Sequence, residues 1–95
     1  MPTPLTLSSL VRWSDNQLAA TVDQEVVVLS VERGSYYGLD DIGSEIWRQL
    51  ATPITVGELC AACAKKYDAE PATIESDVLA LVEKLVAEGL VSLAG

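Results

Sequence analysis

The sequence predicts an α+β domain of winged-helix type, in which a three-stranded antiparallel sheet is followed by three helices. Three observations lead to this fold class. Apolar residues alternate at strand period before Asp40, they recur at helical spacing after it, and no internal repeat is present. The chain has 95 residues, of which 49% are hydrophobic, and this is enough for one domain with its own core.

The strands are expected in the first part of the chain. Residues 1–8 hold two prolines and small polar residues, so we expect a flexible arm before a single domain that spans residues 9–95. The stretch "SLVRWSDNQ" would add a short strand before the turn at Ser14–Asn16. The runs "LAATV" and "EVVVLSV" then flank Asp23–Gln24, which indicates a hairpin. Both faces of the second run are apolar, so that strand is expected at the centre of the sheet.

The stretch "YYGL" is predicted to form the third strand, at an edge of the sheet, after a turn in which Gly34 can take a positive φ. Alternation along this strand points Tyr37 and Leu39 toward the first helix. Tyr36 and Gly38 point away. Tyr37 is therefore expected to pack in the core, and Tyr36 is left exposed for a binding role.

The first helix is expected to begin after Asp40 or Asp41, either of which can serve as the N-cap, and to end near Ala51. Glu45 lies close to the capping-box position of this helix. Trp47 is large and apolar and lies at core spacing with its neighbours, so it is interpreted as a core residue.

The second helix is predicted to begin at Thr55, which forms a capping box with Glu58 three residues later. Cys60 and Cys63 make a C-x-x-C pattern inside this helix. A zinc site needs four ligands and none pairs with these two, and a redox pair is expected at a strand-to-helix turn. We therefore interpret both cysteines as free thiols packed in the core.

The third helix is predicted from Pro71, which suits a first helical turn, to Glu88, with Gly89 as the C′ residue. Its apolar arc is wide enough for two stripes. The stripe expected to face the core is Ile74, Val78, Leu81 and Leu85. The stripe expected on its shoulder, open to a partner, is Leu79, Val82 and Val86. The final "LVSL" would form a short closing strand or a docked tail.

Composition excludes several function classes. Fourteen acidic residues against six basic ones give a net charge of -8, which opposes nucleic-acid binding. The chain has no histidine, which removes the usual general base and the commonest metal ligand, so we expect a protein that binds rather than an enzyme, without metal or cofactor. No apolar run approaches the roughly 20 residues of a membrane span, and no secretory signal precedes the domain, so cytoplasmic residence is expected.

Three segments together resemble one family: "LAATVDQEVVVLSVERGSYYGLDDIGSEIWRQL", "TVGELCAACAKKYD" and "IESDVLALVEKLVAEGLV". In this order they are similar to PqqD-like proteins, the RiPP recognition elements, which bind leader peptides of ribosomally made and modified peptides. The resemblance covers roughly residues 17–93. The pair Ile46–Trp47 is most similar to the discrete recognition proteins of lasso-peptide pathways, in which the domain is fused to a cysteine leader peptidase or separate from it.

The resemblance implies that a precursor leader peptide adds as an antiparallel strand to the edge of residues 35–39, against the third helix, and is delivered to a maturation enzyme. Glu75 would meet a basic leader residue. The implied peptide-binding residues are Ser35, Tyr36, Tyr37, Gly38, Leu39, Glu75, Leu79, Val82 and Val86.

Three other functions stay open at this point. A PqqD-type chaperone would serve a radical SAM enzyme in another modified-peptide pathway. A winged-helix transcription regulator belongs to a different class, and the net charge of -8 stands against it. A subunit with a purely structural role in a larger enzyme would bind no leader peptide at all.

Overall fold

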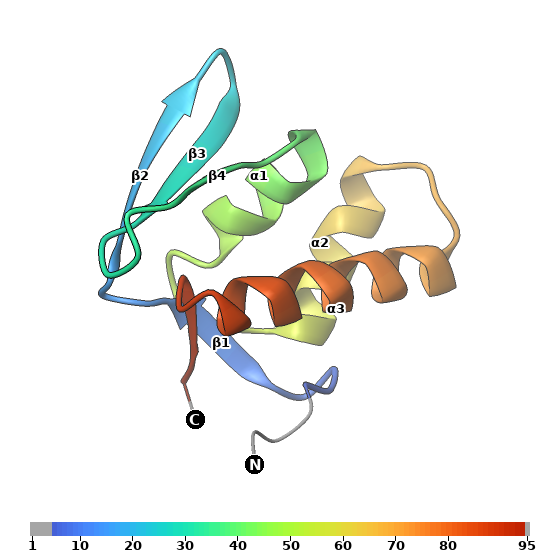
Figure 1. The fold of residues 1–95 in the computed structure, drawn as a ribbon. Helices are drawn as coiled ribbons and strands as arrows, with labels where there is room; N and C mark the ends of the chain where they lie inside the picture. Colours follow the sequence, from blue (N-terminus) through green and yellow to red (C-terminus); the bar gives the residue numbers. More distant parts are fainter. Residues whose placement is uncertain (1–4, 95) are drawn as a thin grey trace.

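The structure is a computed structural model that describes residues 5–94 (Figure 1). It confirms the α+β fold class: two three-stranded antiparallel sheets are combined with three helices. In chain order the elements are β1 (Leu10–Trp13), β2 (Gln17–Val22), β3 (Glu25–Ser30), β4 (Tyr36–Gly38), α1 (Asp41–Gln49), β5 (Ile54–Thr55), α2 (Val56–Lys66), α3 (Pro71–Ala87) and β6 (Val91–Leu93).

The predicted three-stranded sheet has the strand order β2-β3-β4. Its hairpin turn is Asp23–Gln24, where both residues take positive φ angles, of 50° and 74°. Two such residues in succession give the turn a twist that matches that of the flanking strands. The central position of β3, the edge position of β4 and the positive φ of Gly34, at 67°, are confirmed as well.

A second sheet, with the order β5-β1-β6, joins the two ends of the chain. The short strand predicted before the Ser14–Asn16 turn and the closing strand are both confirmed, because β1 pairs with β6 through Val11–Leu93 and Trp13–Val91. Strand β5 was not predicted. It has only two residues, one of which is the N-cap of α2, so it shows no alternation that a sequence pattern could detect.

The helix ends follow the predicted capping residues, with one exception. Asp40 is the N-cap of α1 and accepts a hydrogen bond from Gly43 N at 2.7 Å. Thr55 and Glu58 form the capping box of α2, and Gly89 has a φ of 76° just after α3. The capping role expected for Glu45 is wrong, since it lies five residues after the N-cap and its carboxylate contacts Lys66 Nζ at 3.1 Å instead.

The core lies where the helices meet the two sheets. Trp47 is 2% exposed, and its ring stacks on that of Trp13 at a centroid distance of 5.5 Å. The Trp13 indole N–H donates to Trp47 O at 2.8 Å. Cys60 and Cys63 are buried free thiols, as predicted, and burial raises the pKa of both.

The buried stripe of α3 differs from the predicted one. Val82 is fully buried whereas Leu81 is half-buried, so the core stripe is Ile74, Val78, Val82 and Leu85. Helix α2 packs along α3, and the buried residues of α3 include Val82 in place of Leu81. A helical wheel shows how wide the apolar arc is, but it does not show which neighbour covers each flank.

The predicted arm, residues 1–8, is only partly within the described residues, because residues 1–4 lie outside them. The described part contacts the domain. Leu7 O accepts a hydrogen bond from Gly57 N at 2.9 Å, and Leu5 packs against the core. Residues 5–8 therefore lie against the start of α2, and the flexible arm over residues 1–8 stays a prediction.

Candidate functional site

Strand β4 has one free edge. Its only partner within residues 5–94 is β3, and the pairing is Val27–Gly38, Val28–Tyr37 and Leu29–Tyr36. Beyond the strand's end, Leu39 N donates to Val26 O at 2.9 Å. In an antiparallel pair, hydrogen-bonded positions alternate with positions whose backbone groups face outward. The backbone groups of Tyr37 therefore face β3, and those of Tyr36 and Gly38 face the open edge.

A groove of about 350 Å³ runs between β4 and α3. The start of α1 closes its floor. The groove is open to solvent along β4, where the Tyr36 side chain is 73% exposed and a Cβ on Gly38 would meet no atom within 4 Å. Its lining residues are Tyr36, Tyr37, Gly38, Leu39, Asp40, Gly43, Leu81, Lys84, Leu85 and Glu88.

A cluster of three polar side chains ties β4 to the C-terminal end of α3. The Tyr37 hydroxyl donates to Glu88 Oε2, and Arg33 Nη1 lies 2.8 Å from the same oxygen. The Tyr37 hydrogen bond lowers the pKa of the Glu88 carboxyl, and Arg33 lowers it further. The same hydrogen bond raises the pKa of the Tyr37 hydroxyl. This cluster holds a charged group at one end of the groove without leaving that charge unpaired.

The floor of the groove depends on a close approach between α1 and α3. A Cβ placed on Gly43 would lie 3.1 Å from Asp40 Oδ1, 3.3 Å from Leu39 Cβ and 3.5 Å from Leu81 Cδ2. The first two distances are tight, whereas the distance to Leu81 is an ordinary van der Waals contact, so Leu81 packs beside the first turn of α1. The half-buried Leu81 is the apolar centre of the groove, and the exposed Lys84 lies one turn further along the same helix face.

The structure brings together four of the residues predicted for peptide binding: Tyr36, Tyr37, Gly38 and Leu39 all line the groove. Leu39 is 8% exposed, so it belongs to the core beneath the groove. Ser35 stands just before β4, and its carbonyl accepts a hydrogen bond from Ser30 N. Ser35 therefore extends the pairing with β3 and does not line the groove.

The predicted residues on α3 do not line the groove. Val82 is fully buried, so its expected place on an open shoulder is wrong. Leu79 and Val86 are half-buried and, at 100° per residue, lie across the buried stripe from Leu81. Glu75 lies on that same flank, and its charge contributes to the raised pKa of the Cys60 thiol on α2. This flank therefore faces α2, and β4 lies on the other side.

The groove residues that the sequence interpretation missed are on the opposite flank of α3. Leu81, Lys84 and Glu88 follow one another at spacings of three and four, which places them on one helix face. That spacing was visible in the sequence. It does not by itself indicate a binding face, because Leu81 also fits the core stripe. Asp40 and Gly43 were also missed, since capping and tight packing leave no pattern of a binding site.

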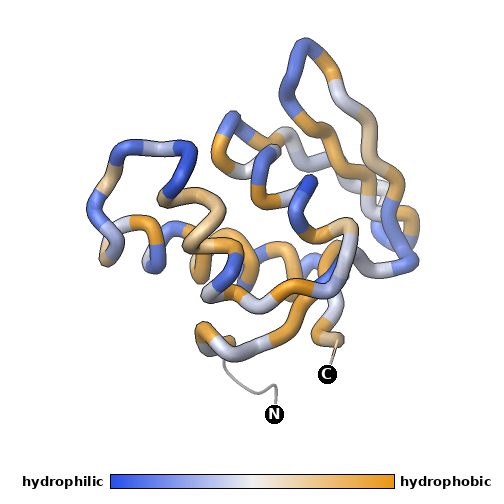
Figure 2. The backbone as a smooth tube through the Cα atoms, turned by 180° about the vertical axis from the view of Figure 1, so that it is seen from behind, coloured by the Kyte–Doolittle hydropathy of each residue, from blue (hydrophilic) through white to orange (hydrophobic). Residues whose placement is uncertain are grey.

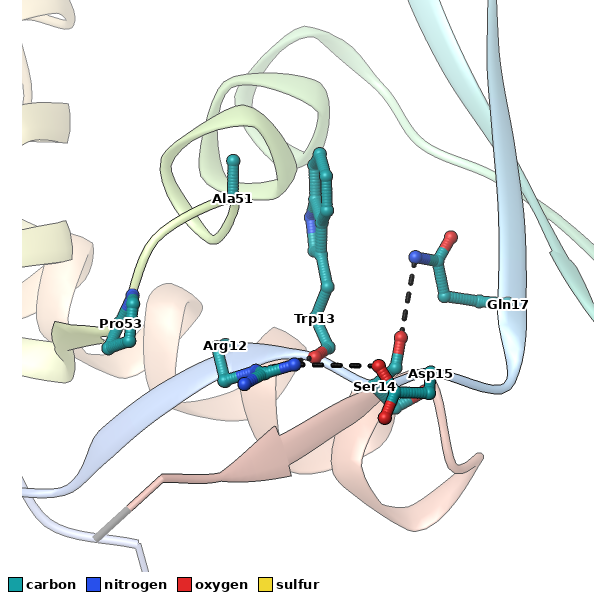
Figure 3. A pocket seen from close by; sticks show the side chains of 7 residues that line it. All are labelled: Arg12, Trp13, Ser14, Asp15, Gln17, Ala51 and Pro53. Carbon is teal, nitrogen blue, oxygen red and sulfur yellow. Dashed lines mark hydrogen bonds and ion pairs between the residues drawn. The ribbon is translucent and has the colours of Figure 1, made fainter.

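A second hollow, of about 440 Å³, lies where β1 leads into β2 (Figure 3). Its polar groups are largely engaged with one another. Arg12 Nη2 lies 3.5 Å from Asp15 Oδ1, and Gln17 Nε2 donates to Ser14 O at 3.5 Å. The Trp13 indole N–H is already bonded to Trp47 O. This arrangement stabilises the turn between the two sheets. Gln17 Oε1 is the exception, because it is buried and has no hydrogen-bond partner within residues 5–94.

The described residues form neither a metal site nor a membrane span. Within residues 5–94, no three side chains of His, Cys, Asp or Glu come together in a way that would hold a metal ion. None of the helices in that range is long and apolar enough to cross a membrane.

Comparison with known proteins connects this geometry to one family. Residues 25–91 match the family described as coenzyme PQQ synthesis protein D (PqqD). This range begins with β3, includes the groove and ends with the first residue of β6. No curated protein sequence matches the chain.

Three solved structures are similar to this fold. TbiB1 in complex with the TbiA(beta) leader peptide is 31% identical, has a TM-score of 0.80, and the match covers 88% of this chain and 98% of TbiB1. Lasso peptide synthetase B1 complexed with the leader peptide is 24% identical, with a TM-score of 0.76 and coverage of 86% and 96%. The stand-alone RiPP recognition element from PqqCD of Methylobacterium extorquens is 22% identical, with a TM-score of 0.75 and coverage of 93% and 94%.

Proposed function

This chain belongs to the PqqD family, and on that premise we propose that it binds the leader segment of a ribosomally made precursor peptide and presents the precursor to a maturation enzyme. Residues 9–95 form the recognition domain in this proposal. The observation that carries it is the open edge of β4, which faces a groove walled by α3. An edge strand left uncovered favours unwanted pairing unless a partner uses it.

The backbone of the leader would pair with β4. Tyr36 and Gly38 supply the outward-facing N–H and C=O groups, and β4 has no proline or lysine to block an added strand. Strand addition of this kind gains affinity from main-chain hydrogen bonds. Because every peptide carries the same main chain, these bonds alone do not select one leader.

The groove would select the leader by its side chains. Alternate residues of an added strand point toward α3, where Leu81 offers an apolar contact and Lys84 a positive charge. Glu88 is already neutralised by Arg33, whereas Lys84 forms no ion pair within residues 5–94. We therefore expect a leader with an apolar residue opposite Leu81 and an acidic or polar residue near Lys84.

The groove carries no pair of groups suited to catalysis. Its lining residues include neither a cysteine nor a serine, and the chain has no histidine to act as a base. The two cysteines are buried elsewhere, with thiol pKa values raised by burial. These features support a recognition module without an activity of its own.

The solved relatives support the lasso-peptide class of pathway. The structures of TbiB1 and of lasso peptide synthetase B1 both contain a leader peptide. A leader peptidase of that class is therefore the maturation enzyme that we propose. A PqqD-type role in another modified-peptide pathway is the second candidate, favoured by the family match over residues 25–91. Titration with a lasso leader and with a leader of the other class separates the two.

The test combines affinity with amide hydrogen exchange. Fluorescence polarisation with a labelled lasso-class leader is expected to give a Kd of ~10⁻⁷ to 10⁻⁶ M, typical of a short strand with a few anchors. In the same complex the amides of Tyr36 and Gly38 should become protected. Those of Tyr37 and Leu39, which already face β3, serve as internal controls. A leader that binds without protecting Tyr36 and Gly38 does not add to β4, and the proposal is then wrong.

A further inference from the structure

The sheet β2-β3-β4 has a second face, which α1 does not cover. In an antiparallel sheet, paired residues point to the same side. Leu18–Leu29 and Ala20–Val27 are such pairs, and they lie opposite to the buried Val26 and Val28. We call this surface the outer face; it comprises Leu18, Ala20, Val22, Val27, Leu29, Tyr36 and Gly38.

The outer face is apolar and exposed to solvent. Leu18 is 63% exposed, Val22 54% and Tyr36 73%. Figure 2 shows hydrophobic residues along both strands of the β2–β3 hairpin, with the hydrophilic turn at its tip, and in Figure 1 this hairpin extends beyond the helices. A contiguous exposed apolar surface on a small protein is typical of an interaction site.

The charges around the outer face are acidic. Asp23 and Glu25 lie at the hairpin tip and Glu32 at the opposite end, and none of these three carboxylates forms an ion pair within residues 5–94. The two nearby cations are already engaged. Arg33 is paired with Glu88, and Arg48, which donates to Gln24 O at the hairpin tip, is paired with Glu45. The occupant of this face should therefore carry basic residues around an apolar centre.

The same charges disfavour a second copy of this chain as the occupant. Each copy has a net charge of -8. Like charges placed together in this way oppose association.

We propose that the outer face is the docking surface for the maturation enzyme that acts on the bound precursor, and that this enzyme meets it with an apolar patch rimmed by Lys and Arg. The inference rests on the proposed leader binding at β4. Tyr36 connects the two surfaces, because its backbone faces the open edge of β4 and its side chain lies on the outer face. An enzyme docked there would lie directly beside the leader strand.

The test uses the intact chain, a lasso-class leader and the purified leader peptidase that removes it. Leu18→Glu and Val22→Glu place charges on the outer face, away from the groove. Isothermal titration calorimetry should show the affinity for the peptidase reduced by about tenfold or more, since each substitution puts an unpaired charge in an apolar contact. The affinity for the leader, measured separately by fluorescence polarisation, should stay within about twofold of wild type.

Thr21→Glu is the matched control, because Thr21 is exposed on the other face of the same strand. It should leave the affinity for the peptidase unchanged, and a circular dichroism melt of each variant checks the fold. If Leu18→Glu and Val22→Glu bind the peptidase as tightly as wild type, the docking surface is not the outer face. Sedimentation as a dimer that these variants dissociate would assign the face to a second copy and overturn the proposal. Failure of the wild-type chain to bind the leader would instead remove the proposed function on which the inference rests.

Discussion

The Tyr37 hydroxyl donates a hydrogen bond to Glu88 Oε2 at 2.5 Å, across 51 positions of the chain. Tyr37 belongs to the edge strand β4, and Glu88 is the C-cap of α3. This contact joins the two walls of the candidate groove at one end. Arg33, in the turn before β4, contacts the same Glu88 oxygen at 2.8 Å, so the hydroxyl is one of two contacts that hold the walls at that end.

Tyr37→Phe keeps the aromatic ring and removes the hydroxyl, so it tests the hydrogen bond to Glu88 without creating a cavity. We expect weaker binding of the leader, because the direct hydrogen bond between the two walls is lost and only the Arg33 contact with Glu88 remains, and only a small fall in the melting temperature. Fluorescence polarisation and a thermal melt measure the two effects. Tyr36→Phe is the control, since the Tyr36 side chain is 73% exposed and lies on the outer face of the sheet. Equal affinity of Tyr37→Phe and wild type would show that the contact does not shape the groove.

Acid should weaken the fold through Glu88 and Glu45. The pKa of Glu88 is lowered from its ordinary value of 4.5 by the Tyr37 hydrogen bond, and that of Glu45 by its contacts with Gln49 and Lys66. Below pH 4.5 the unfolded state binds protons that the folded state does not, so the free energy of unfolding falls as pH decreases toward the lower folded-state values. Urea denaturation between pH 7 and about 3 measures this loss.

Glu88→Gln removes one of the two titrating groups and should flatten the acid limb of that curve. Glu83→Gln, at an exposed position on α3 that forms no ion pair within the described residues, is the matched control. A Glu88→Gln curve with the same slope as wild type would mean that Glu88 titrates equally in the folded and unfolded states.

Leu81→Glu should abolish leader binding while the domain remains folded. Leu81 is half-buried at the centre of the groove, so a carboxylate there can reach water in the free protein but would be buried against the leader in the complex. An unpaired charge buried in this way costs roughly 3 to 5 kcal/mol, which corresponds to more than a hundredfold in Kd. Fluorescence polarisation measures the affinity and circular dichroism the fold.

Leu79→Glu is the matched control for Leu81→Glu. Leu79 is half-buried on the same helix but lies across the buried stripe, on the flank that faces α2. It should bind the leader normally, provided that its melt shows a folded domain. If Leu79→Glu loses binding and Leu81→Glu keeps it, the leader lies on the other flank of α3.

Trp47→Ala should lower the free energy of unfolding by about 3 to 5 kcal/mol, the usual cost of removing a large buried side chain. Trp47 is 2% exposed and also supports the stacked ring of Trp13. Chemical denaturation measures the change. A variant as stable as wild type would show that the surrounding core collapses into the space.

Much of the fold was predictable because its signals are local. The Asp23–Gln24 turn, the capping box of Thr55 and Glu58, and the Gly89 C′ residue each depend on neighbours in sequence, and each is confirmed. Strand β5 was not predictable from such signals. Its two residues pair with β1, which lies far away in the sequence, and no local pattern records this pairing.

The candidate site was predictable on one wall only. Alternation along "YYGL" identified the side chains of β4, because a strand has two faces and one of them is core. A wide apolar helix has a flank on either side of its buried stripe. The sequence does not show which flank α2 covers. The predicted leader-binding residues Leu79 and Val86 therefore lie on the flank opposite to Leu81. The residue that decides this is Val82, whose complete burial becomes visible only in three dimensions.

The stacking of Trp13 on Trp47 has an optical consequence. These are the only two tryptophans of the chain, and neither lines the β4–α3 groove. Their emission and their coupled near-ultraviolet circular dichroism therefore report whether the two sheets and α1 are assembled, whereas they should respond little to a guest strand at β4. A leader that carries its own fluorophore can be followed at a second wavelength. Leader binding and the folded state of the domain can then be measured separately in one sample.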